Sequence, residues 1–371
     1  MNLVRAIACQ AGFLALALGQ APDPRQIFQE AVGMQQRGDY ASAAEQYRRL
    51  VKLQPAALPA WVNLGAALVQ LKEYGEAIAA YRTALSLDRG NRDVQFLLAL
   101  AYFKKGEDAS ASGQLEEMMK AAPGDVRAAT LLGECYLRLG KQDRALGLLA
   151  PLAESAGGNP DFSWVLGSAL IATGRLREGA AVMERVAKQT NAADAYMLAG
   201  RALFRLNEFE RAKADLETAA RLNPELPGVF AALGSALEKN ADNEGAILAF
   251  RKELARNAGD FEANFGLGSV LYFERNLEEA RGYLSQALRL DPSSVLARYE
   301  LALVNKAAGQ FEDAVADLEK VERADPNWQQ IHVELAALYF RVHRPEDGAR
   351  ERQIVDRLSE EERKAGPGAL H

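Results

Sequence analysis

Residues Leu58–Arg89 read LPAWVNLGAALVQLKEYGEAIAAYRTALSLDR. Apolar residues recur at intervals of three and four in both halves of this segment, a spacing that predicts two amphipathic helices. We expect the first helix from about Pro59 to Leu71 and the second from about Tyr74 to Leu87. A tight turn at Lys72-Glu73 would join them. The segment therefore predicts a helical hairpin with one apolar face.

The same pattern returns along most of the chain. A glycine preceded by an apolar residue recurs in the first predicted helix, at Gly65, Gly133, Gly167, Gly200, Gly234 and Gly268. An alanine follows about twelve residues later, at Ala77, Ala145, Ala212, Ala246 and Ala280. Glycine inside a helix costs about 1 kcal/mol relative to alanine, so we expect it to permit close approach of the facing helix. A hairpin this small cannot bury its apolar face alone, so neighbouring hairpins must stack.

The unit resembles the tetratricopeptide repeat. The signature positions of that family are occupied by Trp61, Leu64, Gly65, Leu68, Tyr74, Ala77, Tyr81 and Ala84. Ten such units begin near Pro24, Leu58, Arg92, Val126, Pro160, Ala193, Pro227, Phe261, Val295 and Gln329. The resemblance implies an all-α fold, an α-solenoid over residues 20–362, in which helix-turn-helix units form a right-handed superhelix. It also implies a concave groove lined by the first helix of each unit.

Two units depart from the pattern. The tenth has Pro345 and Gly348 where Tyr and Ala are usual, and its last helix is highly charged, as expected of a repeat that caps a solenoid. The fifth has Gly179 in place of Ala, and its end at Ala187–Ala192 is one residue short, which suggests a local change in curvature. We expect residues 363–371 to form a disordered tail.

The N-terminal segment has the layout of a secretory signal peptide. Arg5 supplies a positive charge, the residues from Ala6 to Leu18 are apolar except for Gln10, and small residues precede a possible cut before Gln20. Residues 1–19 are therefore predicted to direct export, to a periplasmic or secreted location. The alternatives are an uncleaved membrane anchor and a wrongly assigned start codon. The apolar run is too short for a stable transmembrane helix.

Composition excludes several classes of function. The chain has 371 residues with a net charge of −6, 3 His and 2 Cys. Such a chain has few ligands for a metal site and is a poor nucleic-acid binder. We find no phosphate loop, zinc motif or catalytic triad, so we expect no enzyme activity, cofactor or metal. Cys135 is interpreted as a small buried hydrophobe, and His332 and His343 as surface or half-buried residues.

The resemblance implies that groove side chains come from places two, five, nine, twelve and thirteen of each unit. Projected onto this chain, these places carry apolar or aromatic residues beside a row of cations. The candidate groove residues are Phe96, Phe103, Lys104, Arg138, Trp164, Met197, Arg201, Phe204, Arg205, Lys239, Phe265, Tyr272, Tyr299 and Phe340. Aromatic residues and arginine commonly anchor interfaces. In the alternative interpretation the aromatics pack between helices and the cations pair with Glu134 and Glu238.

These features predict an exported, non-catalytic scaffold or adaptor. Its ligand would be a partner protein or peptide with hydrophobic anchors and acidic groups, held in the groove. The alternative is a structural spacer in a cell-envelope assembly or secretion complex. Some members of the family clamp a C-terminal carboxylate with Lys and Asn. The ninth places here contain no Asn, so that clamp is not expected.

Overall fold

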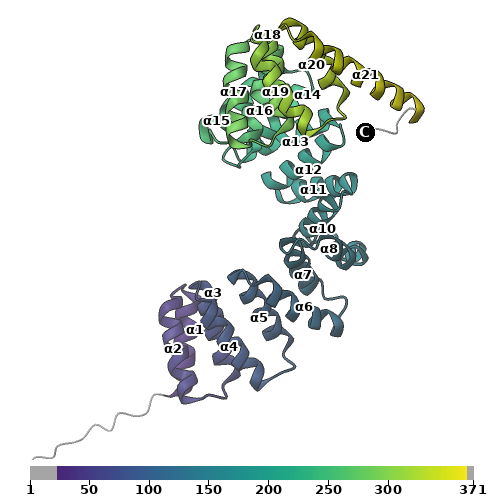
Figure 1. The fold of residues 1–371 in the computed structure, drawn as a ribbon. Helices are drawn as coiled ribbons and strands as arrows, with labels where there is room; N and C mark the ends of the chain where they lie inside the picture. The colour runs from purple at the N-terminus through teal and green to yellow at the C-terminus, as the bar shows by residue number, and fades with distance from the viewer. Residues whose placement is uncertain (1–22, 366–371) are drawn as a thin grey trace, which may run out of the picture. The chain divides into compact units, whose positions relative to one another are not determined.

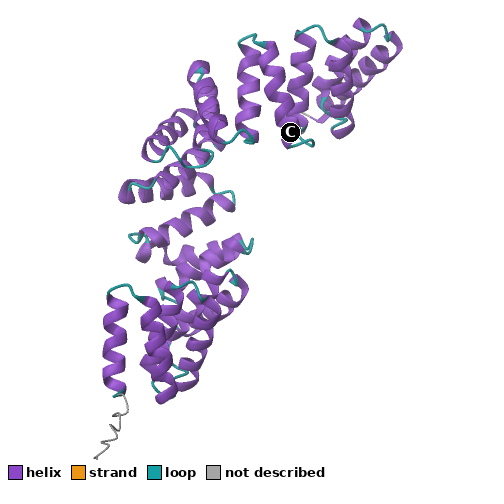
Figure 2. Ribbon diagram, turned by 90° about the vertical axis from the view of Figure 1, so that its left-hand side faces the viewer, coloured by secondary structure: helices purple, strands orange, loops and turns teal. Residues whose placement is uncertain are grey.

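The computed structural model describes residues 23–365, which form helices and turns without any strand (Figures 1 and 2). The prediction of an all-α fold is therefore confirmed. The signal segment predicted at residues 1–19 lies outside the described residues. None of the described helices is both long and apolar enough to cross a membrane.

The helices fall into two compact modules, which are considered separately. The N-terminal module, residues 23–149, contains α1 (Pro24–Gln36), α2 (Tyr40–Leu53), α3 (Leu58–Gln70), α4 (Tyr74–Leu87), α5 (Arg92–Lys105), α6 (Asp108–Ala121), α7 (Val126–Arg138) and α8 (Gln142–Leu149). These are the predicted hairpins of the first four repeats. The helices α3 and α4 match the predicted bounds within one residue.

The C-terminal module, residues 150–365, begins with the 3₁₀ turn Ala150–Leu152. Its helices are α9 (Ala153–Ala156), α10 (Pro160–Ala172), α11 (Leu176–Thr190), α12 (Ala193–Arg205), α13 (Phe209–Leu222), α14 (Val229–Lys239), α15 (Asn243–Arg256), α16 (Phe261–Phe273), α17 (Leu277–Leu290), α18 (Val295–Ala307), α19 (Phe311–Ala324), α20 (Gln329–Arg341) and α21 (Pro345–Ala365). Consecutive helices pack on one another, as the stacked-hairpin prediction requires.

The glycines of the first helices lie against large side chains of the second helices. A Cβ atom at Gly65 would lie 2.5 Å from Cε1 of Tyr81, and one at Gly234 would lie 2.6 Å from Cδ1 of Phe250. Both rings are almost completely buried. The expected close approach of paired helices is confirmed at these positions, because no larger residue fits beneath the ring.

The turns within hairpins depend on left-handed residues. Gly106 caps α5 with φ 84°, and Lys72, two residues after the end of α3, has φ 62°. The left-handed conformation is easy for glycine and strained for a lysine. The tight turn expected at Lys72-Glu73 therefore forms without glycine.

The second helix of the fourth repeat is interrupted, which we did not predict from the sequence. The helix α8 ends at Leu149, and a 3₁₀ turn containing Pro151 separates it from the short α9. Proline has no N–H to donate and its ring clashes with the preceding turn, so it breaks a helix interior. The boundary between the two modules falls here, after Leu149.

The seventh repeat begins later than its spacing predicts. We expected its start near Pro227, but α14 begins at Val229, after Gly228 in the left-handed conformation with φ 73°. The buried carboxylate of Glu253 accepts hydrogen bonds from the backbone N–H groups of Gly228, at 3.1 Å, and Phe230, at 3.2 Å. A side chain from the second helix thus replaces the usual local N-cap.

The last repeat ends in the charged helix α21, which continues to Ala365, so residues 363–365 of the expected tail are helical. The rest of that tail, residues 366–371, lies outside the described residues.

In the fifth repeat, α11 ends at Thr190 and is followed by Asn191 with φ 55°. A Cβ atom at Gly179 would lie 2.6 Å from Cγ1 of Ile171, so this departure from Ala accommodates α10.

Candidate functional site

The C-terminal module contains a cavity of about 350 Å³ against its first helices. Its lining residues are Ile171, Leu198, Arg201, Ala202, Phe204, Arg205, Leu216, Ala232, Ser235 and Glu262. Three of the predicted groove residues, Arg201, Phe204 and Arg205, meet here on α12. Six of these lining residues are apolar, and the other four are two arginines, one serine and one glutamate.

The stacking of first helices builds this cavity. The helix α14 contacts both α12 and α16, which belong to the repeats on either side of it. Arg201 on α12 therefore reaches Glu262 on α16, 61 residues away, with 3.1 Å between Nη2 and Oε2. Ser235 on α14 lies between them and donates from Oγ to Oε1 of Glu262 at 3.3 Å. The charge of Arg201 is thus balanced inside the cavity.

Arg205 differs from Arg201 in its surroundings. It is exposed, and within residues 23–365 it forms no ion pair. Its neighbour Phe204 is half-buried and packs edge-on against Phe209, with 5.4 Å between ring centroids. The cavity therefore presents one unpaired cation next to an aromatic ring that is held in place.

The other predicted residues of the C-terminal module are mostly half-buried. Buried core clusters that extend over neighbouring repeats are contacted by Trp164, Met197, Phe265, Tyr272 and Tyr299. This agrees with the alternative in which aromatics pack between helices. Lys239 pairs with Glu238 at 3.2 Å. Phe340 is 39% exposed, and the guanidinium of Arg352 lies 4.3 Å from the centroid of its ring.

In the N-terminal module the predicted residues lie on α5 and α7. Phe103 is covered by the guanidinium of Arg138, which lies 4.4 Å from the ring centroid and pairs with Asp108 at 3.2 Å. Phe96 is covered in the same way by Arg127 at 4.3 Å. Cation–π contacts of this kind hold both partners in place. Lys104 is exposed and has no ion pair among the described residues.

Sequence reasoning missed several residues of the same face. Glu262 occupies the second place of the eighth repeat and neutralises Arg201. Phe273, 66% exposed, occupies the thirteenth place of that repeat, where we considered only cations. Leu296, 59% exposed, and Val333, 42% exposed, occupy the second and fifth places of the following repeats. All four residues stand at groove places of their repeats, so the same projection could have identified them.

The interpretation of His332 as a surface or half-buried residue is wrong. The side chain is 1% exposed, its Nδ1 lies 2.6 Å from Oε2 of Glu351, and its Nε2 lies 2.9 Å from the carbonyl oxygen of Pro326. Ligand atoms of His332, Glu351 and Glu322 lie within 4.8 Å of one another. Both imidazole nitrogens already have hydrogen-bond partners, so the cluster has the geometry of a buried pair that fixes α21 on α20.

Two carboxylates of the C-terminal module have pKa values that their surroundings raise. Burial raises the pKa of Glu300 to about 7, against the hydrogen bond from Ser269, and Oε2 of Glu300 has no hydrogen-bond partner. Burial, followed by the charge of Glu184, raises the pKa of Asp215 to about 6. Cys135 is buried as predicted, and burial raises the pKa of its thiol to about 12, so it is a poor nucleophile.

Paired helices stacked in series, with a cavity against their first helices, define a helical-repeat scaffold of the kind that binds other proteins. Models of the tetratricopeptide repeat match residues 28–93, 68–135, 193–226, 231–295 and 265–327. The chain belongs to the tetratricopeptide repeat family.

One curated protein and two solved structures illustrate the likeness. The chain is 29% identical over 111 residues to the TPR repeat-containing thioredoxin TTL4 of Arabidopsis thaliana, a match that spans 30% of this chain and 16% of that protein. The Cut9–Hcn1 hetero-tetramer of the APC/C aligns with a TM-score of 0.52 and 14% identity, over 92% of this chain and 88% of the other. MamA from Desulfovibrio magneticus RS-1 aligns with a TM-score of 0.43 and 24% identity, over 46% of this chain and 96% of the MamA chain. The Cut9 likeness supports the fold alone.

Proposed function

We propose that this chain is an exported, non-catalytic scaffold that binds a partner protein or peptide along its first helices, with the Arg205 cavity as an anchor point. The family supports the general class, since tetratricopeptide solenoids typically mediate protein–protein interaction. The cavity supports the finer statement, because an unpaired cation beside a fixed aromatic ring suits a ligand with an apolar anchor and an acidic group.

The observation that carries the proposal is the contrast between two arginines on one helix. Arg201 is neutralised by Glu262 at 3.1 Å, whereas Arg205 has no described carboxylate partner. An exposed cation that is not required for the fold remains available for a ligand. A preformed cavity also loses little conformational entropy on binding.

The first prediction concerns Arg205→Glu. We expect this variant to lose capture of the partner, because the substitution places a negative charge where the ligand presents one. A photo-crosslinking amino acid at position 239, on the same face, would report the partner in the native cell. Arg221→Glu, an exposed arginine on α13, is the matched control and should leave the adduct unchanged.

The spacer alternative has a different outcome. A second crosslinker at position 248 lies on α15, where Leu248 is 57% exposed. Adducts formed only from this second-helix position, and unaffected by Arg205→Glu, would support a structural spacer of a cell-envelope or secretion assembly and contradict binding through the cavity.

Export is the part of the proposal that depends on the N-terminal segment. N-terminal sequencing of the mature protein from the native cell should begin near Gln20. A mature protein that begins at Met1 would support the uncleaved anchor or an unexported scaffold instead.

A further inference from the structure

Three consecutive helices of the last two repeats bring together three side chains that can bind a metal ion. Glu322 comes from α19, His332 from α20 and Glu351 from α21 (Figure 1). One ligand atom from each lies within 4.8 Å of the other two. Because the three residues belong to three helices, their spacing matches no short metal-binding motif, and sequence reasoning did not find the group.

The hydrogen bonds of His332 determine which of its nitrogens can bind a metal. Nε2 lies 2.9 Å from the carbonyl oxygen of Pro326. A carbonyl oxygen only accepts hydrogen bonds, so Nε2 carries a proton and Nδ1 is the nitrogen that faces the other ligands. Metal-binding histidines commonly donate their second ring N–H to a backbone carbonyl in this way.

A single proton holds His332 and Glu351 together. Nδ1 and Oε2 are 2.6 Å apart, and both would present lone pairs to each other without a proton between them. The two side chains are 1% and 9% exposed, so little water reaches this contact. The buried pair described above is the protonated form of the contact. A divalent cation can replace the shared proton and accept both lone pairs.

Glu322 adds a third ligand that the pair does not use. It is half-buried, and among the described residues neither Glu322 nor Glu351 forms an ion pair with a lysine or an arginine. The negative charges of the two carboxylates repel each other, and a cation between them removes that cost. The partial exposure of Glu322 also gives an ion a path of entry.

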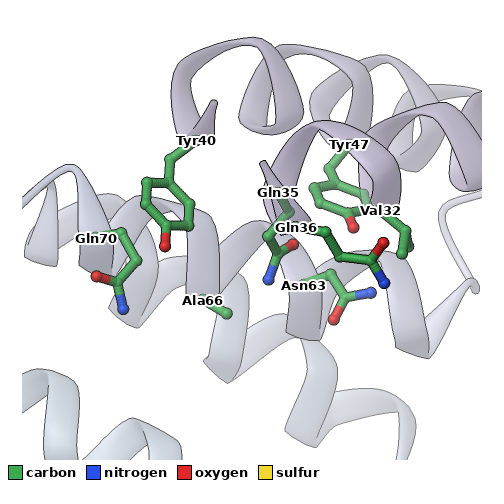
Figure 3. A pocket seen from close by; sticks show the side chains of 8 residues that line it. All are labelled: Val32, Gln35, Gln36, Tyr40, Tyr47, Asn63, Ala66 and Gln70. Atoms are coloured by element: carbon green, nitrogen blue, oxygen red, sulfur yellow. The ribbon is translucent and has the colours of Figure 1, made fainter. Parts of the chain in front are cut away.

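A polar cavity in the N-terminal module lacks these features. This cavity of about 380 Å³ lies between the first two repeats (Figure 3). Its polar lining consists of tyrosines and side-chain amides, and the Tyr47 hydroxyl has the Asn63 side chain as its partner. None of its lining residues is a histidine, cysteine, aspartate or glutamate, so it offers no ligand set for a metal.

We propose that Glu322, His332 and Glu351 bind Zn²⁺ and that the ion fastens α21 to α19 and α20. One imidazole nitrogen with two carboxylate oxygens suits Zn²⁺, whereas Mg²⁺ and Ca²⁺ prefer oxygen ligands alone. Bonds of about 2.0–2.2 Å to a tetrahedral Zn²⁺ keep two ligand atoms about 3.3 Å apart. Glu351 therefore moves back from its 2.6 Å contact by less than about 1 Å when the ion replaces the proton.

The test uses the full chain without a purification tag, treated with a chelator and then titrated with ZnCl₂ in a calorimeter. We expect one Zn²⁺ per chain with a dissociation constant below about 1 μM. Titrations in buffers of different ionisation enthalpy should show release of about one proton per ion. Zn²⁺ should also slow proteolysis of residues 345–365, and millimolar Mg²⁺ should not compete.

Glu322→Gln is the decisive variant, because Glu322 takes no part in the His332–Glu351 pair. It should weaken Zn²⁺ binding by at least about tenfold and leave the stability of the metal-free chain unchanged. Glu312→Gln, at an exposed position on the same helix, is the matched control and should bind Zn²⁺ as the wild type does. The double variant His332→Leu with Glu351→Leu should fold and bind no Zn²⁺.

Arg205→Glu should leave Zn²⁺ binding unchanged, which separates this site from the proposed function. Failure of the wild type to bind Zn²⁺, or equal binding by the wild type and Glu322→Gln, would overturn the proposal. Binding that persists in the double variant would place the ion elsewhere, for example at the exposed His343, and would overturn it as well.

Discussion

At the scale of single residues, the contact between a first-helix glycine and a bulky second-helix side chain sets how closely the two helices of a hairpin can pack. Gly65 faces Tyr81 and Gly234 faces Phe250, at distances that leave no room for a methyl group. Close-packed interiors tolerate added volume poorly, because the neighbouring backbone must move. The glycine is therefore retained although it weakens the helix itself.

The second prediction tests this contact with Gly234→Ala. The new Cβ would lie 2.6 Å from the buried ring of Phe250, so we expect a net loss of about 1–3 kcal/mol in the free energy of unfolding. Gly282→Ala on α17 is the matched control, because no heavy atom lies within 4 Å of its Cβ position. That variant should gain up to about 1 kcal/mol. Urea unfolding of both variants measures the difference, and equal effects would contradict the packing argument.

The third prediction concerns pH. The pKa of Glu300 is raised from 4.5 to about 7, so between these pH values the unfolded chain loses this proton while the folded chain keeps it. Glu300 therefore reduces stability progressively as pH rises through that range, by on the order of 3 kcal/mol above pH 7.

Glu300→Gln removes this ionisation and keeps an acceptor for Ser269. We expect the variant to match the wild type near pH 4 and to be more stable near pH 8, as measured by urea unfolding at both values. Glu312→Gln, at an exposed position on α19, is the control. A stability difference that is the same at both pH values would show that Glu300 is not held protonated by its surroundings.

At the scale of helices, α21 is attached to α20 by a buried pair rather than by the repeat pattern alone. His332 contributes an almost completely buried ring, and Glu351 reaches it from α21 with 2.6 Å between Nδ1 and Oε2. Breaking such a pair by removing one partner leaves the other buried without compensation, which costs more than replacing both.

The fourth prediction follows from that asymmetry. His332→Leu should lower the free energy of unfolding by about 3 kcal/mol, because it strands the carboxylate of Glu351. The double variant with Glu351→Leu should recover most of the loss. Protease resistance of residues 345–365 would show whether α21 is the element released. Additive losses in the double variant would mean that the two side chains stabilise the chain independently.

The sequence predicts the bounds of the helices better than the contacts between them. The hairpin bounds at α3 and α4 follow from local spacing, because ten repeats in phase reinforce one another. The His332–Glu351 pair does not follow, since Glu351 lies on a helix that departs from the pattern. The sequence shows Pro151, but the repeat pattern predicted an uninterrupted helix at this position.

At the scale of the whole molecule, the residues that resist prediction are those joined across repeats. Arg201 and Glu262 are 61 residues apart and meet only because α14 holds α12 and α16 beside it.

The contact of a first-helix glycine with a bulky second-helix side chain has a consequence for refolding. It fixes the register inside a hairpin, yet it recurs at Gly65, Gly200, Gly234 and Gly268, with a ring at two of these positions and a leucine at the other two, so it does not distinguish one hairpin from another. A first helix from one molecule can accept the matching second helix of a neighbour at little cost. Concentrated refolding should therefore yield exchanged, interlocked dimers, whereas dilution favours correct pairing through the shortness of the connecting turns.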